Sequence, residues 1–156
     1  MLKTLKIEYA EFSSMEELQP ADAELLEKAL EATSSSYSPY SHYPVGAAVR
    51  MSDGRIVAGS NQENAAFPSG LCAERTAIFS AHANYPDSNM EAIAIVSSEK
   101  GKMAGIPAFP CGACRQVMAE SQKRAGAPLR IIVGSACRIY IFNGVDSLLP
   151  FIFTAI

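Results

Sequence analysis

The sequence predicts an α/β fold, in which helices cover both faces of a mixed sheet of roughly five strands to form a three-layer α-β-α sandwich. Short apolar runs alternate along the chain with longer segments of helical periodicity, which is the pattern of strands packed against helices. The turn pair Asp53-Gly54 lies between two apolar runs and predicts a hairpin. With 49% hydrophobic and 19% charged residues, the chain fits one domain with one core, residues 1–156.

The first predicted helix covers residues 21–35, because Pro20 lies near its start and apolar residues follow at helical spacing. That apolar stripe consists of Leu25, Leu26, Ala29 and Leu30. The other elements are predicted from periodicity, length and flanking turn residues. In chain order they are a hairpin over 45–60, a polar loop over 61–70, a helix over 71–85, a strand over 92–98, a helix over 111–123, strands over 128–135 and 137–144, and a short terminal helix over 146–152.

The two ends of the chain both suggest contacts beyond an ordinary core. Residues 1–19 form an N-terminal extension, in which the loose alternation of residues 3–12 predicts an edge strand or a subunit contact. The closing stretch LLPFIFTAI is almost wholly apolar, although termini are usually exposed. Because a small domain has little spare core, we expect another subunit to cover Phe151, Phe153 and Ile156.

Charge and composition exclude several classes of partner. A net charge of −3 makes the chain a poor binder of polynucleotides, so a nucleic-acid-like substrate is expected to be a small molecule. No stretch approaches the ~20 apolar residues of a membrane span, and the N-terminus lacks the apolar run of a signal peptide. With four cysteines and no secretion signal, we expect a cytoplasmic protein without membrane contact, in which a close cysteine pair is more often a metal or redox site than a disulfide.

Cys111 and Cys114, three residues apart, lie at the start of a predicted helix. This spacing puts both sulfur atoms on one side of the helix start, as in a redox couple, half of a structural zinc site, or part of a catalytic metal site. Two ligands do not hold zinc, so a metal site needs a third. Cys72 is the best candidate, because it also precedes a predicted helix and two helix N-termini aimed at one point favour anionic sulfur.

The remaining cysteine and the two histidines fit a metal site less well. Cys137 lies in a strand pattern, where a buried structural cysteine is more common. His82 follows Cys72 by ten residues on the same predicted helix, about 15 Å along its axis, and cannot share a site with the helix start. His42 lies in a turn-rich loop and is less easily excluded, but it has no metal-like spacing to any partner.

Two charged residues close to Cys72 extend the metal hypothesis. Three thiolates would leave Zn²⁺ one open coordination position, as catalytic zinc needs, and would give the site a charge of −1. Arg75 lies on the same helical face as Cys72 and can compensate that charge; the less favoured alternative is a solvated surface arginine. Glu74 can join the site only if Cys72 is the helix cap and Glu74 lies in the first turn. There it is either a proton carrier or a residue that stabilises the helix dipole.

These motifs resemble the zinc-dependent cytidine deaminase family. The stretches CAERTAI and PCGACRQV resemble the family's two metal motifs. YSPYSHYPVGAAV resembles its substrate segment, NQENAAF resembles its sugar loop, and LLPFIF resembles its C-terminal segment. The first Cys, together with Ala113, resembles the small homotetrameric branch that acts on free nucleosides, whereas polynucleotide editors carry His first. The resemblance implies a cytidine deaminase-like fold, one Zn²⁺ per subunit, a small nucleoside substrate and a homotetramer.

The resemblance also implies a role for each matching residue. Cys72, Cys111 and Cys114 hold zinc, while Glu74 takes a proton from the attacking water, passes it to ring N3 and protonates the leaving ammonia. By the same resemblance, Asn61 and Glu63 bind the ribose 3′-hydroxyl, and Tyr43 packs near the base. The backbone of Ala73 binds the base carbonyl. Ala65, Phe67 and Phe153 reach into a neighbouring subunit's site. Arg115 and Gln116 are taken as helix-packing or supporting groups.

The sequence departs from the family pattern at three positions. Phe67 stands where Tyr is usual, which removes a hydroxyl near the 5′ end of the sugar. Tyr43 replaces Phe and adds a hydroxyl near the base that must find a partner. Phe109 stands before Pro110 where a small polar residue is common, which is expected to reshape the pocket rim.

The predicted reaction is hydrolytic deamination of cytidine and 2′-deoxycytidine to uridine and 2′-deoxyuridine plus ammonia, in pyrimidine salvage. One alternative is deamination of a related cytosine nucleoside such as blasticidin S, although that branch usually has a bulkier basic residue in place of Ala113 and lacks the Arg75-Thr76 pair. A non-catalytic structural zinc module would need a fourth protein ligand. A thiol-disulfide oxidoreductase would use Cys111 and Cys114 as a redox couple without metal.

Overall fold

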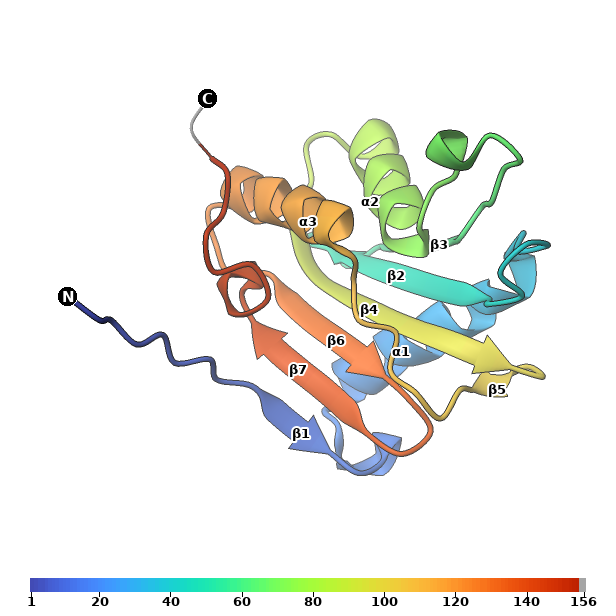
Figure 1. Cartoon of the computed structure of the whole chain (residues 1–156), viewed down its shortest axis with the longest axis horizontal. Coiled ribbons are helices and arrows are strands. Elements are labelled where there is room, and N and C mark those ends of the chain that lie inside the picture. Colours follow the sequence, from blue (N-terminus) through green and yellow to red (C-terminus); the bar gives the residue numbers. More distant parts are fainter. Residues whose placement is uncertain (155–156) are drawn as a thin grey trace.

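A single mixed sheet forms the middle layer of the protein (Figure 1). The computed structural model describes residues 1–154. The strands are β1 (Ala10–Phe12), β2 (Val45–Met51), β3 (Ile56–Ser60), β4 (Met90–Glu99), β5 (Lys102–Met103), β6 (Arg130–Gly134) and β7 (Ile139–Asn143). Their order is β1-β7-β6-β4-β2-β3, with β5 paired to β4; β4 and β6 are parallel and the other pairs antiparallel. The seven strands exceed the predicted five by the short edge strands β1 and β5.

Helices cover both faces of this sheet, which confirms the predicted three-layer sandwich (Figure 1). Helix α1 (Pro20–Ala32) packs on one face, and helices α2 (Ala73–Asn84) and α3 (Gly112–Ala125) pack on the other. The core on the α1 side includes Leu25, Leu26, Ala29, Ala94 and Ile132. The core on the α2–α3 side includes Ile78, Met118, Ile93, Ile95 and Ile131. Within residues 1–154, no helix has both the length and the apolar character needed to cross a bilayer.

The β2–β3 hairpin contacts helices of both outer layers. Its turn contains Gly54 with a φ of 87°, a left-handed conformation that glycine adopts readily. Gly46 and Gly59 allow the helices to approach closely. A Cβ atom on Gly46 would collide with the carbonyl oxygen of Ala29 in α1, and one on Gly59 would lie 2.5 Å from the backbone nitrogen of Ala77 in α2. The hairpin therefore fixes the distance of the sheet from helices on its two opposite faces.

The structure corrects two details of the predicted elements. The predicted terminal helix over 146–152 is wrong: only a 3-10 turn, Val145–Ser147, forms there, because Pro150 disfavours a helical conformation in the residue before it. The first helix ends at Ala32, and a 3-10 turn carries the chain on to Ser35. The other 3-10 turns are Met15–Glu17 and Phe67–Ser69.

The N-terminal extension supplies the edge of the sheet. The predicted edge strand is present as β1, although it is only three residues long and pairs antiparallel with β7. The residues before it extend away from the sheet (Figure 1). At the other end of the chain, Phe151 and Phe153 are 93% and 62% exposed, whereas Ile156 lies outside the described residues.

Candidate metal and substrate site

Three cysteine sulfur atoms meet where helices α2 and α3 begin. Cys72 is the N-cap of α2 and Cys111 the N-cap of α3, while Cys114 is buried in the first turn of α3. The Sγ atom of Cys111 lies 3.9 Å from that of Cys72 and 3.5 Å from that of Cys114, and all three lie within 4.8 Å of one another. The structure thus brings the predicted third cysteine to the predicted pair.

The thiols of Cys72 and Cys114 affect each other's ionisation. Hydrogen bonding to Cys114, with a further contribution from Arg75, lowers the pKa of the Cys72 thiol to about 5. The same hydrogen bond, followed by burial, raises the pKa of Cys114 above its ordinary value. Cys72 is therefore the more acidic thiol of the pair.

Arg75 provides positive charge beside these sulfur atoms. Its Nη2 atom lies 3.7 Å from the Sγ atom of Cys72, and this contact is the main reason why the pKa of Arg75 is raised. Its Nε atom is buried without a hydrogen-bond partner among residues 1–154. The guanidinium group is thus held against the thiols rather than solvated at the surface.

Glu74 lies beside the thiols in the first turn of α2. The residue is only 5% exposed, and burial raises the pKa of its carboxyl group. Since Cys72 is the cap and Glu74 follows within the first turn, the structure has the arrangement that allows both to face one site. A carboxyl group with a raised pKa is suited to accept and return a proton near neutral pH.

A cavity of about 400 Å³ opens beside the thiols and Glu74. Its wall contains all four of the predicted substrate-binding residues, Tyr43, Asn61, Glu63 and Ala73. An adjoining cavity of about 520 Å³ shares Asn61, Glu63 and Cys72 with the first and extends it toward Tyr40 and Phe67. The two cavities together run from the thiols to the polar loop over 61–70.

Hydrogen bonds from backbone and side-chain groups position Asn61 and Glu63. The Asn61 side chain accepts hydrogen bonds from Ser36 Oγ and from the Val45 N–H, and donates one to the Tyr43 carbonyl. Glu63 Oε2 accepts the N–H groups of Tyr40 at 2.9 Å and Ser41 at 3.2 Å. A hydrogen bond from the Ser41 side chain is the largest of several causes that lower the pKa of Glu63.

These bonds leave part of each group free for a ligand. The amide of Asn61 has a second N–H, and Glu63 has a second carboxylate oxygen. A donor and an acceptor are thereby presented side by side at the cavity wall, and together they can bind a hydroxyl group.

The added hydroxyl of Tyr43 has a partner. It lies 3.0 Å from Ser97 Oγ at the end of β4, and Ser97 in turn donates to the Ile106 carbonyl. The hydroxyl thus points into the protein framework and leaves the ring at the cavity wall. The hydroxyl that Tyr43 adds to the family pattern is therefore hydrogen-bonded within the chain.

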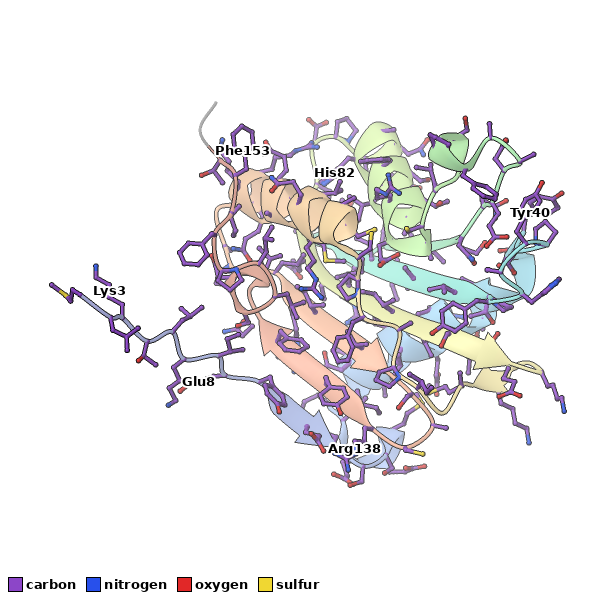
Figure 2. The ribbon with its side chains drawn as sticks, in the orientation of Figure 1. Lys3, Glu8, Tyr40, His82, Arg138 and Phe153 are labelled. Atoms are coloured by element: carbon purple, nitrogen blue, oxygen red, sulfur yellow. The ribbon has the colours of Figure 1, made fainter. Side chains whose placement is uncertain are left out.

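The three residues expected to act in a neighbouring subunit are exposed in this chain. Ala65 and Phe67 lie in the polar loop, and Phe67 is 74% exposed. Phe153 lies beside α3, at the side of the molecule away from Tyr40 (Figure 2). Its carbonyl accepts a hydrogen bond from Gln116, and the Leu148 carbonyl accepts one from Arg115, so α3 holds the C-terminal segment in place.

Several cavity residues were missed from the sequence. Pro107, Ala108, Gly70 and Leu71 lie outside the motifs quoted from the sequence, while the predicted substrate segment and sugar loop contain residues that received no individual role, namely Tyr40, Ser41, Val45, Gln62 and Asn64. Ser36, which binds Asn61, was also missed, because a serine-rich stretch reads only as a turn. No periodicity or metal-type spacing distinguishes these residues in the sequence.

The residues judged less suitable as ligands lie elsewhere. His82 Nε2 is 3.0 Å from Ser121 Oγ between α2 and α3, and Cys137 is exposed rather than buried as predicted. Strand β7, in which Cys137 was expected to lie, begins only at Ile139, so Cys137 lies in the turn before it. Among residues 1–154, the group of His, Cys, Asp and Glu side chains close enough to share a metal ion consists of the three cysteines.

Comparison with known proteins decides the family. Residues 19–126 match the family model described as the cytidine and deoxycytidylate deaminase zinc-binding region. The chain belongs to this deaminase family. A cytidine deaminase of Halalkalibacterium halodurans is 40% identical over 131 residues, which cover 84% of this chain and 92% of that relative.

Solved structures of the deaminase family have the same fold. A cytidine deaminase from Burkholderia pseudomallei superposes with a TM-score of 0.69 at 37% identity and covers 83% of this chain and 97% of its own. A cytidine deaminase from Mycobacterium tuberculosis superposes with a TM-score of 0.66 at 32% identity, covering 84% and 95%.

The cysteine cluster fits the zinc that gives the family region its name. In a tetrahedral site with Zn–S bonds of about 2.3 Å, ligand sulfur atoms lie roughly 3.8 Å apart. The measured separations of 3.5 and 3.9 Å are close to that value. Thiolates are ligands that zinc prefers, and three of them leave one coordination position for water or substrate.

Proposed function

We propose that this protein is a zinc-dependent deaminase that hydrolyses cytidine and 2′-deoxycytidine to the corresponding uridines and ammonia. The observation that carries this proposal is the buried Glu74 carboxyl beside three clustered thiols, at the wall of a cavity large enough for a nucleoside. A structural zinc site has no need of a proton-carrying group or of a cavity.

Each residue of the site has a defined task in this reaction. Cys72, Cys111 and Cys114 would hold Zn²⁺, which supplies a Lewis acid that activates water for attack on C4 of the base. Glu74 accepts a proton from the attacking water and delivers it to N3 of the ring. It then transfers the second proton of that water to the amino group as the C4–N bond breaks and ammonia leaves. Arg75 balances the negative charge of the thiolates.

The cavity wall orients the nucleoside. The free N–H of Asn61 and the free oxygen of Glu63 bind the ribose 3′-hydroxyl, the Tyr43 ring packs near the base, and the backbone of Ala73 binds the base carbonyl. Because none of these contacts requires a 2′-hydroxyl, both sugars are accepted. The product fits a role in pyrimidine salvage, and the three free thiols favour the reducing cytoplasm.

Replacement of Glu74 tests the mechanism. Glu74→Gln keeps the shape of the side chain but removes the proton carrier, so kcat is expected to fall by about 10²- to 10⁴-fold. The zinc-to-protein ratio should stay at that of the wild type, because the three thiols are unchanged. The exposed Glu120→Gln in α3 is a matched control and should keep full activity. Near-normal turnover by Glu74→Gln would refute the mechanism.

Substrate choice is tested by one ultraviolet assay of a single preparation with cytidine, 2′-deoxycytidine, cytosine and blasticidin S. Turnover of both nucleosides supports the proposal. Turnover of blasticidin S alone would assign the chain to a different substrate. Reversible oxidation of Cys111 and Cys114 in protein that contains no zinc would favour a redox enzyme.

We propose further that the active form is a homotetramer in which Ala65, Phe67 and Phe153 complete a neighbouring subunit's site. The exposed phenylalanine side chains and the position of Phe153 beside α3 support this arrangement. Light scattering should give four times the chain mass of 16.7 kDa. A mass equal to that of one chain would contradict the proposal.

Co-expression tests whether sites are shared. Glu74→Gln and Phe153→Ala subunits each carry one defect, but mixed tetramers contain sites with an intact Glu74 and a neighbour's intact Phe153. Activity above the sum of the two separate variants is expected. Strictly additive activity would place Phe153 outside the neighbouring site.

A further inference from the structure

The N-terminal extension contacts an aromatic cluster that reaches the candidate active site. Tyr9 lies directly before β1, and its ring centroid is 5.9 Å from that of Tyr140 and 5.7 Å from that of Phe142. Phe109 contacts the same two rings, with centroids 5.4 and 6.3 Å away. Tyr9 and Phe109, one hundred residues apart in the chain, therefore rest on the same pair of side chains of β7.

Phe109 also belongs to the wall of the inner cavity. It lines the cavity together with Cys111 and Glu74, and it is 44% exposed. Only Pro110 separates it from Cys111, whose thiol belongs to the metal cluster. The aromatic cluster thus supports a part of the cavity rim that is next to the reacting groups.

The position of Tyr9 is fixed by strand pairing. Ala10 is opposite Ile141 in the antiparallel β1–β7 ladder, so Tyr9 lies at the level of Phe142. An ion pair of 2.8 Å joins Glu11 in β1 to Arg138, which directly precedes β7. Tyr9, Tyr140 and Phe142 all lie outside residues 19–126, the region that matches the family model, whereas Phe109 lies inside it.

We propose that Tyr9 is a positioning residue for substrate binding, which acts by holding Tyr140 and Phe142 against Phe109 and so fixes the rim of the cavity. Phe109 is the side chain through which this effect reaches the substrate. The choice of a nucleoside as substrate rests on the proposed function. The physical coupling between Tyr9 and Phe109 does not depend on it.

Kinetics of a set of variants tests the role of Tyr9. Tyr9→Ala should raise KM for cytidine about three- to tenfold, the size of one or two lost aromatic contacts, while kcat changes less than about twofold. Zinc content should stay unchanged. Tyr9→Phe keeps the ring and should restore the wild-type KM. Leu5→Ala removes another exposed apolar side chain of the extension and should have no effect.

A double-mutant cycle tests whether Tyr9 acts through Phe109. Tyr9→Ala combined with Phe109→Ala should raise KM no further than Phe109→Ala alone. Independent, additive effects would overturn the proposal, as would an unchanged KM in Tyr9→Ala when the wild type is active on cytidine.

A fluorescence experiment tests the coupling without any substrate. The sequence contains no tryptophan, so Phe109→Trp introduces a single reporter at the rim. Adding Tyr9→Ala to this variant should shift the emission to longer wavelength and increase quenching by acrylamide, whereas adding Leu5→Ala should not. Identical spectra would refute the coupling even in an active enzyme. A spectral shift in protein that fails to deaminate cytidine would refute only the proposed function.

Discussion

The two faces of the sheet bury similar apolar side chains. Helix α1 covers one face and helices α2 and α3 cover the other, but only α2 and α3 begin at cysteines. On the α1 face, the buried carboxylate of Asp22 is neutralised by a bidentate ion pair with Arg130. On the α2–α3 face, burial and, to a lesser degree, the charge of Cys72 raise the pKa of the Glu74 carboxyl. The first face thus carries a carboxylate paired within the chain, whereas the second gathers three thiols that are close enough to hold a metal ion.

This difference between the two faces of the sheet indicates that residues on the α1 face contribute to stability, whereas residues on the α2–α3 face contribute to the reaction. Breaking a buried ion pair by removing one partner leaves the other partner's charge uncompensated, so the Asp22–Arg130 pair contributes to stability. A buried carboxyl whose pKa is raised exchanges protons readily, at a cost in stability. If the two faces have these separate tasks, variants on them should separate activity from stability.

The largest effect is expected from removing a thiol of the metal cluster. Cys114→Ala should abolish zinc binding, because a two-thiolate site holds zinc weakly, and activity should fall by at least about a thousandfold. Metal analysis and kcat are the measurements. Cys137→Ala is the matched control, since Cys137 is exposed and remote from the cluster. Zinc loss in the control would instead favour a closed, structural site with four ligands.

A smaller effect is expected from paired glycine substitutions on the two faces. Gly59→Ala forces α2 away from the sheet near Ala77, which displaces Cys72 and Glu74, so kcat should fall by up to about a hundredfold. Gly46→Ala forces α1 away near Ala29 and should lower the free energy of unfolding by about 1–3 kcal/mol with kcat unchanged.

Urea unfolding and kcat, measured on both glycine variants, decide the comparison. Both proteins should be less stable than the wild type. The separation of tasks fails if Gly46→Ala loses as much kcat as Gly59→Ala at temperatures where both are folded.

The metal cluster was predictable because its residues lie at helix starts. A cysteine at a predicted helix N-terminus can be recognised in the sequence. The cysteines of two helices meet when both N-termini point to the same place. The placement of Glu74 in the first turn followed from the same boundary. The layers of the fold were predictable for a related reason, since the periodicity of each segment shows which face is apolar.

The support of the site was not predictable in the same way. Tyr9 and Phe109 meet only because β1 pairs with β7 in one particular register, and nothing local in either segment indicates that register. The hydrogen bond from Ser36 to Asn61 likewise joins two loops. The terminal helix was wrong because an apolar composition outweighed Pro150 in the prediction, whereas in the chain the backbone restriction prevails.

The smallest effect is expected from the ion pair on the α1 face. Asp22 in α1 has a side chain only 7% exposed and meets Arg130 at 2.7 and 2.9 Å, although the two residues are 108 positions apart. Asp22→Asn leaves the guanidinium without its charged partner and should lower the free energy of unfolding by about 1–3 kcal/mol. Glu31→Gln, which breaks the exposed Lys28–Glu31 pair of the same helix, should cost less than about 0.5 kcal/mol.

Both variants on α1 should keep the kcat and the zinc content of the wild type, because neither residue lies near the thiols or the cavity wall. Urea denaturation of the two proteins beside the wild type measures the difference. Equal stabilities for Asp22→Asn and Glu31→Gln would show that the buried pair contributes no more than a surface pair. In that case charge balance on the α1 face would come from solvent, and the contrast with the α2–α3 face would rest on the cysteines alone.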